Sequence, residues 1–505
     1  MNNTGGYRND RQDRADNRTQ NTAPRGNYSH RNGQAAGQQR PAQGQQRPVQ
    51  GQRPANRPPQ PQQQRPSRPQ QSGAPVQPRQ PSEVRRNTAS TSVAPAKRPG
   101  KVSKPKKPDS RAVAWVKHIF RLKDDEVVRV RYTEDSGYDY VFLVIVLVLL
   151  AFGTIMVYSA SYAYSKWKYD DSYYIISRQF MFMAVGLVGM MFTMRLKPDT
   201  YRAGAIPLFL VCFFLLCIVP IPGIGRVHGG ARRWLSIGFT EIQPSEFMKT
   251  GLVFMLAWYI DRYHKRITDL TYRGRATFFG VFVPLVITGV VCVLMILEKH
   301  LSGTIIMFAI GVVLIFVSGA NSRPLYALGG LGVAVLGVAA FVLPHARERL
   351  EYWIHPELDP QGKGYQTLQG LYAIGSGGFF GVGLGESRQK HLYVSQPQND
   401  FIFTIVCEEL GFVGAATVIL LFLLFLWRGI SIAMKAPDVF SQLVVAGIVS
   451  KVVIQAVLNI AVVTKSIPNT GISLPFFSYG GSSLCVLIAE MGIVLSISRY
   501  TKQKK

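Results

Sequence analysis

The sequence has little cysteine, little histidine and few acidic residues for its length. Its 505 residues include 5 cysteines and 8 histidines, with 29 Asp and Glu against 57 Lys and Arg, which gives a formal net charge of +28. No HExxH motif and no Cys/His pair at zinc-ligand spacing occurs, which argues against a structural metal site. Every cysteine falls within an apolar run, which indicates small core residues and not a disulfide framework: Cys212, Cys217, Cys292, Cys407 and Cys485.

Large apolar residues are almost absent from residues 1–110, which are rich in Gln, Pro, Arg, Asn and Gly. Such a segment cannot bury enough surface to offset chain entropy, so we expect a disordered cytoplasmic tail. Residues 1–135 contain 27 Lys or Arg and 10 Asp or Glu. A basic tail could bind nucleic acid, anionic lipid or a partner protein; we favour a solvated tail in weak contact with anionic lipid and expect no nucleic acid partner. We also expect no signal peptide, because the first apolar run begins after residue 110 without a small-residue cleavage site behind it.

Residues 111–135 form a juxtamembrane segment. The stretch RAVAWVKHIFRLK places Trp115, Val116, Ile119 and Phe120 on one helical face. This pattern fits an amphipathic helix in the cytoplasmic interface, with a plain linker helix as the alternative.

Long apolar runs dominate residues 136–500. A run of about 20 apolar residues is long enough to cross a bilayer core of about 30 Å. The sequence therefore predicts an all-α integral membrane protein with ten transmembrane helices. We place them near residues 139–160, 179–195, 203–221, 245–260, 277–297, 304–319, 325–343, 401–426, 441–463 and 479–498.

Basic residues in the short loops predict that both termini are cytoplasmic. The exception is GIGRVHGGARRW, which would be external despite its arginines. This orientation places the polar loop 344–400, between the seventh and eighth spans, on the outer face. The connection TKSIPNTGISLPFFS before the last span is external too. Irregular backbone at a membrane persists where it packs in protein or lines a watered cavity, so we expect these two segments to meet over one outward cleft.

Asp400 is the leading candidate for catalysis. It lies directly before the eighth span, where a water-soluble headgroup can arrive, and a carboxylate there could act as a general base toward a hydroxyl. An N-terminal helix cap would account for the same residue.

Six further charged residues within or beside the spans could form a relay or structural ion pairs: Glu246, Lys249, Glu408, Glu409, Lys451 and Glu490. Glu246 and Lys249 are spaced for an i,i+3 pair. Lys451 could pair with Glu408 or Glu409, or with Glu490, and such buried pairs fix helix register.

The stretch GSGGFFGVGLG resembles a phosphate-cradling loop only weakly, because no GKS/T follows it. External cations could bind an anionic pyrophosphate, with contact to lipid headgroups as the alternative. These candidate substrate-binding residues are Arg232, Arg233, Lys363, Arg388 and Lys390.

Four long motifs resemble the SEDS family (shape, elongation, division and sporulation), whose members are FtsW, RodA and SpoVE. They are ARRWLSIGFTEIQPSEFMK, DPQGKGYQTLQGLYAIGSGGFFGVGLGESRQK, NDFIFTIVCEELGFVG and IPNTGISLPFFSYGGSSL, in the expected order. The ARRWLSIG stretch is more like the division and sporulation members than RodA. The chain departs from the family at LEKHLSGT, where relatives often have a QPDLGT-like segment, at YVSQP and at Lys465.

The resemblance implies a GT-C-like fold and a peptidoglycan glycosyltransferase that polymerises lipid II on the outer face of the membrane during cell division. The acid of the family's DFIF motif corresponds to Asp400, which would deprotonate the acceptor hydroxyl as undecaprenyl pyrophosphate leaves with inversion. A class B penicillin-binding protein and other division proteins are implied partners. Whether a divalent cation takes part stays open.

Two other functions compete with this one. Buried charges would suit a flippase for lipid-linked precursors, although no internal repeat between the two halves is evident. A non-catalytic scaffold that recruits division proteins would not require Asp400.

Overall fold

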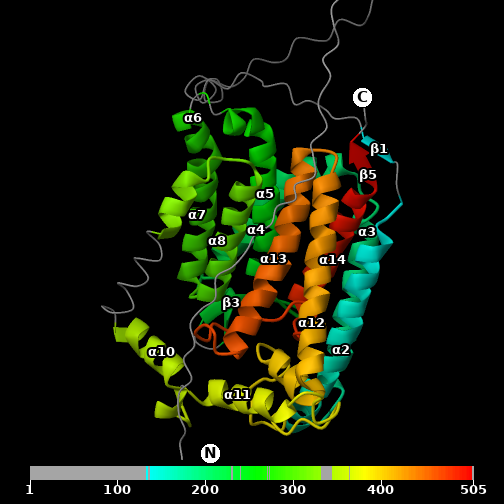
Figure 1. Ribbon diagram of the computed structural model, residues 1–505, viewed down its shortest axis with the longest axis vertical. Helices are drawn as coiled ribbons and strands as arrows, with labels where there is room; N and C mark the ends of the chain where they lie inside the picture. The colour runs from blue at the N-terminus through cyan, green and yellow to red at the C-terminus, as the bar shows by residue number, and fades with distance from the viewer. Residues whose placement is uncertain are drawn as a thin grey trace, which may run out of the picture. The chain divides into compact units, whose positions relative to one another are not determined.

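The computed structural model describes residues 132–134, 137–228, 231–238, 240–269, 271, 273–330, 344–362 and 364–502. The predicted tail, the amphipathic helix near 111–123, Lys363 and most of the span predicted at 325–343 lie outside these residues. The described part is mostly helical (Figure 1). Its helices are α2 (Tyr140–Tyr169), α3 (Tyr174–Thr193), α4 (Pro198–Ile218), α5 (Pro244–Thr268), α6 (Arg273–Thr277), η2 (Phe278–Phe282), α7 (Val283–Leu297), α8 (Leu301–Val317), α10 (Pro344–Ile354), η3 (Pro356–Leu358), α11 (Tyr365–Gly377), α12 (Ile402–Lys435), α13 (Val439–Val463) and α14 (Gly481–Ser498).

Seven of the described helical runs are long and apolar enough to cross a membrane: α2, α3, α4, the run Arg273–Leu297, α12, α13 and α14. The chain is therefore a multi-pass membrane protein. Helix α8 is apolar but has only 17 residues. Helix α5 ends in the polar sequence DRYHKRIT, which lowers its hydropathy. The count of ten spans stays a prediction.

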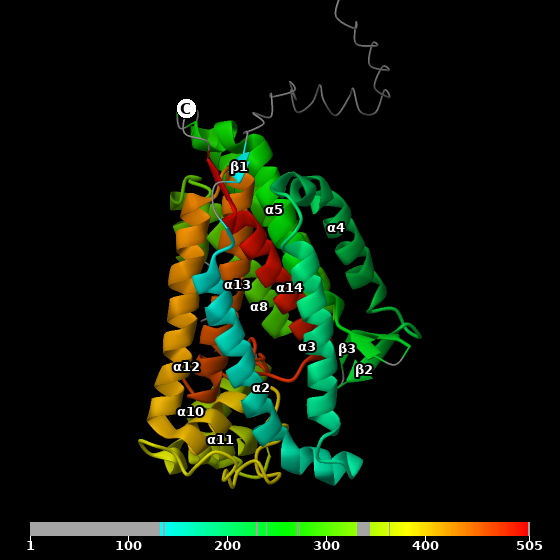
Figure 2. The ribbon, with the colours of Figure 1, turned by 90° about the vertical axis from the view of Figure 1, so that its right-hand side faces the viewer.

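Close packing between the helices depends on small residues. In a membrane the hydrophobic effect does not drive helices together, because lipid tails are as apolar as the side chains, so close van der Waals contact matters more. Helices α3 and α14 lie side by side (Figure 2). A Cβ added at Gly492 of α14 would lie 2.4 Å from the carbonyl oxygen of Met190 in α3. Beside it, the Thr193 hydroxyl donates a 2.8 Å hydrogen bond to the Ala489 carbonyl. Gly492 thus permits the backbone contact that positions α14.

Two small sheets correct the all-α prediction. The segment that contains the GIGRVHGGARRW stretch folds into a three-stranded antiparallel sheet of β2 (Gly225–His228), β3 (Ala231–Ile237) and β4 (Thr240–Ile242). At one end of the helical bundle, β1 (Tyr132–Glu134) pairs antiparallel with β5 (Tyr500–Lys502). Four of these five strands have only three or four residues, and the longer β3 (ARRWLSI) does not alternate between apolar and polar residues, so no clear strand pattern appears in the sequence.

Helices α10 and α11 lie across the end of the bundle where α12 begins (Figure 1). Helix α12 is broken at Gly411, whose backbone has φ 64° and ψ −160°. The glycine-rich segment after α11 pairs with this break: the Val382 amide donates to the Glu408 carbonyl at 3.0 Å, and the Phe412 amide donates to the Gly378 carbonyl at 3.0 Å. Within GSGGFFGVGLG, Gly377 and Gly381 therefore allow close backbone contact, because a Cβ at either would collide with a carbonyl oxygen of α12.

We expect Gly411→Ala to lower the free energy of unfolding by about 3 kcal/mol or more. Its backbone conformation is essentially restricted to glycine, and a Cβ there would lie 2.3 Å from the Gly381 nitrogen. Thermal unfolding of the purified protein in detergent measures the effect. Gly289→Ala, in α7 with nothing within 4 Å of an added Cβ, is the matched control. Equal midpoints for the two variants would contradict the prediction.

Candidate functional site

Asp400 lies where the loop 344–400 and the connection before α14 are tied together. The Asn459 side chain of α13 donates hydrogen bonds to the carbonyls of Asp400, at 2.7 Å, and Ile472, at 2.6 Å. The Ser478 hydroxyl donates to the Asn399 carbonyl at 2.7 Å. The loop that ends at Asp400 and the connection before α14 therefore meet, as the sequence predicted.

The Asp400 carboxylate does not cap α12. The cap residue is Phe401, which has no side-chain capping bond, and none of the described residues donates a hydrogen bond to the Asp400 carboxylate. A Cβ added at Gly471 would lie 3.1 Å from Oδ2 of Asp400, so this glycine leaves room for the carboxylate. Burial raises the pKa of Asp400 to about 6. The Asp400 carboxylate therefore accepts no hydrogen bond from the described residues, and its pKa lies close to neutral pH.

A cavity of about 200 Å³ opens beside Asp400. Its walls come from the β-sheet, the start of α5, the α7–α8 connection, α13 and the segment before α14. The polar and charged lining residues include Arg233, Gln243, Ser245, Glu246, Lys249, His300, Ser302, Asn399, Asp400, Gln455, Ser473, Tyr479 and Ser483. The cavity thus combines one free carboxylate with groups that can donate hydrogen bonds.

The predicted pair Glu246–Lys249 lines this cavity. The Lys249 ammonium lies 2.7 Å from Glu246 and donates a 3.1 Å hydrogen bond to the Gln455 side chain. The pair forms at the first turn of α5, where the i,i+3 spacing brings the two side chains onto one face. The i,i+3 prediction is confirmed, and the pair also joins α5 to α13.

Arg233 provides a fixed cation on the cavity wall. Its guanidinium donates to the backbone carbonyls of Glu298, at 3.4 Å, and Lys299 in the α7–α8 connection. Burial raises the pKa of the Glu298 carboxyl to about 8, which the Arg233 charge opposes. Burial, followed by the Arg233 charge, lowers the pKa of His300 to about 4. Near pH 7 the Glu298 carboxyl and the His300 ring are therefore mainly neutral. Of these three side chains, only Arg233 carries a charge.

The other described cations that were predicted to bind substrate do not line this cavity. Arg232 and Arg388 do not line it, and the Lys390 side chain is buried elsewhere. Lys363 lies outside the described residues. Their role in substrate binding stays a prediction, whereas Arg233 is in place beside Asp400.

The chain matches one protein-family model, FtsW/RodA/SpoVE, described as a cell cycle protein, over residues 140–503. The chain belongs to this family. Stage V sporulation protein E of Bacillus subtilis is 43% identical over 372 residues, which are 73% of this chain and 99% of that protein. A "Probable peptidoglycan glycosyltransferase FtsW" of Trichlorobacter lovleyi is 37% identical over 371 residues, or 73% of this chain and 94% of that one.

Solved structures agree with this membership. The crystal structure of the rod shape determining protein RodA of Thermus thermophilus matches with a TM-score of 0.53 and 27% identity, over 73% of this chain and 98% of that one. A chain from "Structural coordination of polymerization and crosslinking by a peptidoglycan synthase complex" matches with a TM-score of 0.59 and 28% identity, over 72% and 98% of the two chains.

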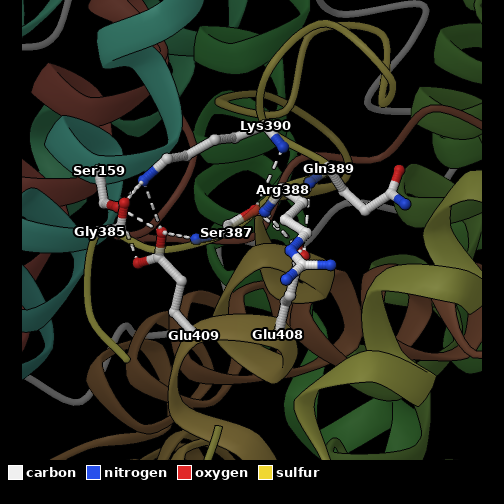
Figure 3. A network of polar contacts seen from close by, with 8 residues as sticks. All are labelled: Ser159, Gly385, Ser387, Arg388, Gln389, Lys390, Glu408 and Glu409. Atoms are coloured by element: carbon white, nitrogen blue, oxygen red, sulfur yellow. Dashed lines mark hydrogen bonds and ion pairs between the residues drawn. The ribbon is translucent and has the colours of Figure 1, made fainter. Parts of the chain in front are cut away.

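In this family member Glu408 and Glu409 anchor the loop 344–400 (Figure 3) and do not line the Asp400 cavity. Glu409 accepts from the Lys390 ammonium at 2.9 Å and from the Ser159 hydroxyl of α2. Glu408 accepts from the Arg388 amide at 2.9 Å and from the Ser387 hydroxyl. The two acids therefore hold residues 387–390 against α2 and α12.

Lys451 pairs with Glu490, which also accepts a hydrogen bond from the Thr250 hydroxyl. Of the partners considered for Lys451, the structure selects Glu490 and excludes Glu408 and Glu409, which bind the loop. The contacts join α5, α13 and α14 inside the bundle, as a register-fixing pair does.

Sequence reasoning did not select Gln455, Asn459 or His300 as site residues. Gln455 and Asn459 are four residues apart in an apolar span, so they lie on one helical face. Polar side chains within a membrane span often mark a functional site, and this is the sequence signal that could have identified them. His300 lies in the segment that departs from the family pattern. Among the described residues, no group of three or more His, Cys, Asp or Glu is placed to hold a metal ion.

Proposed function

We propose that the chain is a peptidoglycan glycosyltransferase that polymerises lipid II at the outer face of the plasma membrane. The observation that carries the proposal is the Asp400 carboxylate, which is free of hydrogen bonds from the described residues and opens onto a polar cavity. Family membership and relatives named as peptidoglycan glycosyltransferases support the same activity.

In this mechanism Asp400 takes the proton of the acceptor sugar's 4-hydroxyl as that oxygen attacks the anomeric carbon of the donor. The bond from the anomeric carbon to undecaprenyl pyrophosphate breaks, and the configuration inverts. Arg233 and Lys249, both in the cavity wall, offset negative charge that grows on the leaving pyrophosphate. A neutral His300 leaves these two cations as the positive groups of the site.

We propose ten spans with both termini in the cytoplasm. The β1–β5 pairing supports this topology, because two strands that meet on one side require an even number of crossings between them. Seven crossings would place these strands on opposite sides. Asp400 and the end of α12 at Lys435 then lie on opposite faces of the membrane.

We propose a class B penicillin-binding protein as the partner, and the similarity to a chain of a peptidoglycan synthase complex supports it. Polymerisation of purified lipid II by the reconstituted chain with its cognate transpeptidase tests the function. Glycan strands are expected from the wild type. Precursor movement across vesicles without polymer would favour a flippase, and neither activity would favour a scaffold. Reactions with Mg²⁺ and with a chelator show whether a divalent cation takes part, since Mg²⁺ prefers carboxylate and pyrophosphate oxygens.

The cellular role that we propose is septal wall synthesis in cell division. The similarity to a stage V sporulation protein favours a role in sporulation as the second candidate. Depletion in growing cells separates them: filaments without septa would indicate division, and normal growth with defective spores would indicate sporulation.

We expect the polymerisation rate to depend on the ionisation of Asp400. A general base must be deprotonated, and the pKa of this carboxyl is about 6. The rate should fall about tenfold per pH unit below that value and level off above it. Initial rates between pH 4.5 and 8 measure the profile, with the folded fraction checked at each pH. A rate that is flat down to pH 4.5 would exclude Asp400 as the base.

A further inference from the structure

A second cavity, of about 450 Å³, lies far from Asp400, where α2 begins and α12 and α14 end. The length of α12 separates the two sites, because Asp400 precedes its first residue and Lys435 is its last. The residues used below are Tyr138, Asp139, Tyr140, Arg428, Lys435 and Tyr500, all of which line this cavity. None of them takes part in the proposed reaction.

The cavity has an excess of positive charge. Arg428 pairs with Asp139 at 2.9 Å, which leaves that carboxylate neutralised. Lys435 is exposed, and none of the described residues forms an ion pair with it. Next to the cavity, Arg499 lies 4.8 Å over the Tyr138 ring and donates a 3.3 Å hydrogen bond to its hydroxyl. An anionic occupant therefore complements the site.

Apolar side chains face outward from the helices on both sides of the cavity. On α2, Val141 and Val144 are 49% and 57% exposed; on α12, Ile430 and Met434 are 46% and 73% exposed. Tyr140, at the first residue of α2, is 67% exposed. These surfaces suit acyl chains, with the cavity at the level of the lipid headgroups.

We propose that this cavity binds the headgroup of an anionic phospholipid. Lys435 provides the charge for the lipid phosphate, and the hydroxyl of Tyr140, a 67% exposed residue, can donate a hydrogen bond to the phosphate oxygens. The acyl chains lie along the apolar faces of α2 and α12. The chain's own tail is a poor occupant, because residues 1–131 carry a large excess of Lys and Arg that a cationic cavity repels.

Native mass spectrometry of the full chain in detergent tests the proposal, with phosphatidylglycerol and phosphatidylcholine of identical acyl chains as probes. The wild type should retain phosphatidylglycerol in preference to phosphatidylcholine. Lys435→Gln should weaken phosphatidylglycerol binding about fivefold, since one interfacial cation contributes that much. Lys197→Gln, an exposed lysine before α4, is the matched control and should bind as the wild type does.

Three results would overturn the proposal. One is a lack of selectivity, seen either as equal retention of the two lipids or as equal phosphatidylglycerol binding by the wild type and Lys435→Gln. Another is full competition by soluble glycerol phosphate, which would identify a free anion as the ligand. The third is cross-linking of Lys435 to a lysine within residues 1–131 in preparations saturated with phosphatidylglycerol, which would identify the tail as the occupant.

Discussion

Replacement of Asp400 by Asn is expected to reduce glycan polymerisation by about 10²–10⁴-fold, the usual contribution of a general base. Asparagine keeps the size of the side chain but cannot accept the hydroxyl proton. The main chain at this position is held by Asn459 and does not depend on the carboxylate, so the fold should survive. Polymer yield from purified lipid II, at equal folded amounts, measures the loss.

Glu386→Gln is the control for this variant. Glu386 is an exposed acid in the same loop, 344–400, and its side chain does not line the Asp400 cavity. We expect wild-type rates from it. An Asp400→Asn protein that polymerises normally would place the base elsewhere, while a variant that fails to fold would be recognised by its unfolding midpoint and replaced by Asp400→Ser.

Loss of the Lys390 ammonium should have the largest effect on stability of any single change in the loop 344–400. Lys390→Met leaves the Glu409 carboxylate buried without its cation, and breaking a buried pair in this way costs about 3–5 kcal/mol. The double variant Lys390→Met, Glu409→Gln removes both charges and should recover most of that stability. Thermal unfolding in detergent measures each protein.

The matched control for the buried pair is Lys166→Met, which removes an exposed i,i+4 pair with Asp170. Solvent screens this surface pair, so its loss should leave the unfolding midpoint unchanged. If Lys390→Met also left the midpoint unchanged, the Lys390–Glu409 contact would not stabilise the loop.

Seven of the predicted spans and the position of Asp400 just before α12 could be predicted because they depend on local sequence. An apolar run such as VFLVIVLVLLAFG specifies a helix in lipid by itself, and the first predicted span matches the start of α2. The Glu246–Lys249 pair was predictable for the same reason, since its spacing lies within one helical turn.

The partners of Lys390 and the break in α12 could not be predicted. Lys390 reaches Glu409 only because the loop folds back onto α12 and α2, a contact set by tertiary packing. Gly411 lies inside a predicted span, two residues after Glu409, and its positive φ follows from pairing with the glycine-rich segment. Neither contact leaves a periodic signal in the sequence.

The pairing of β1 with β5 sets an order on biosynthesis. β1 is made before α2, whereas β5 is made only after α14. β1 must therefore remain unpaired on its own side of the membrane until every span between the two strands is in place. The ladder can close only around a chain in which all of these crossings have been inserted in the right direction, so the pairing reports correct insertion of the segment from α2 to α14.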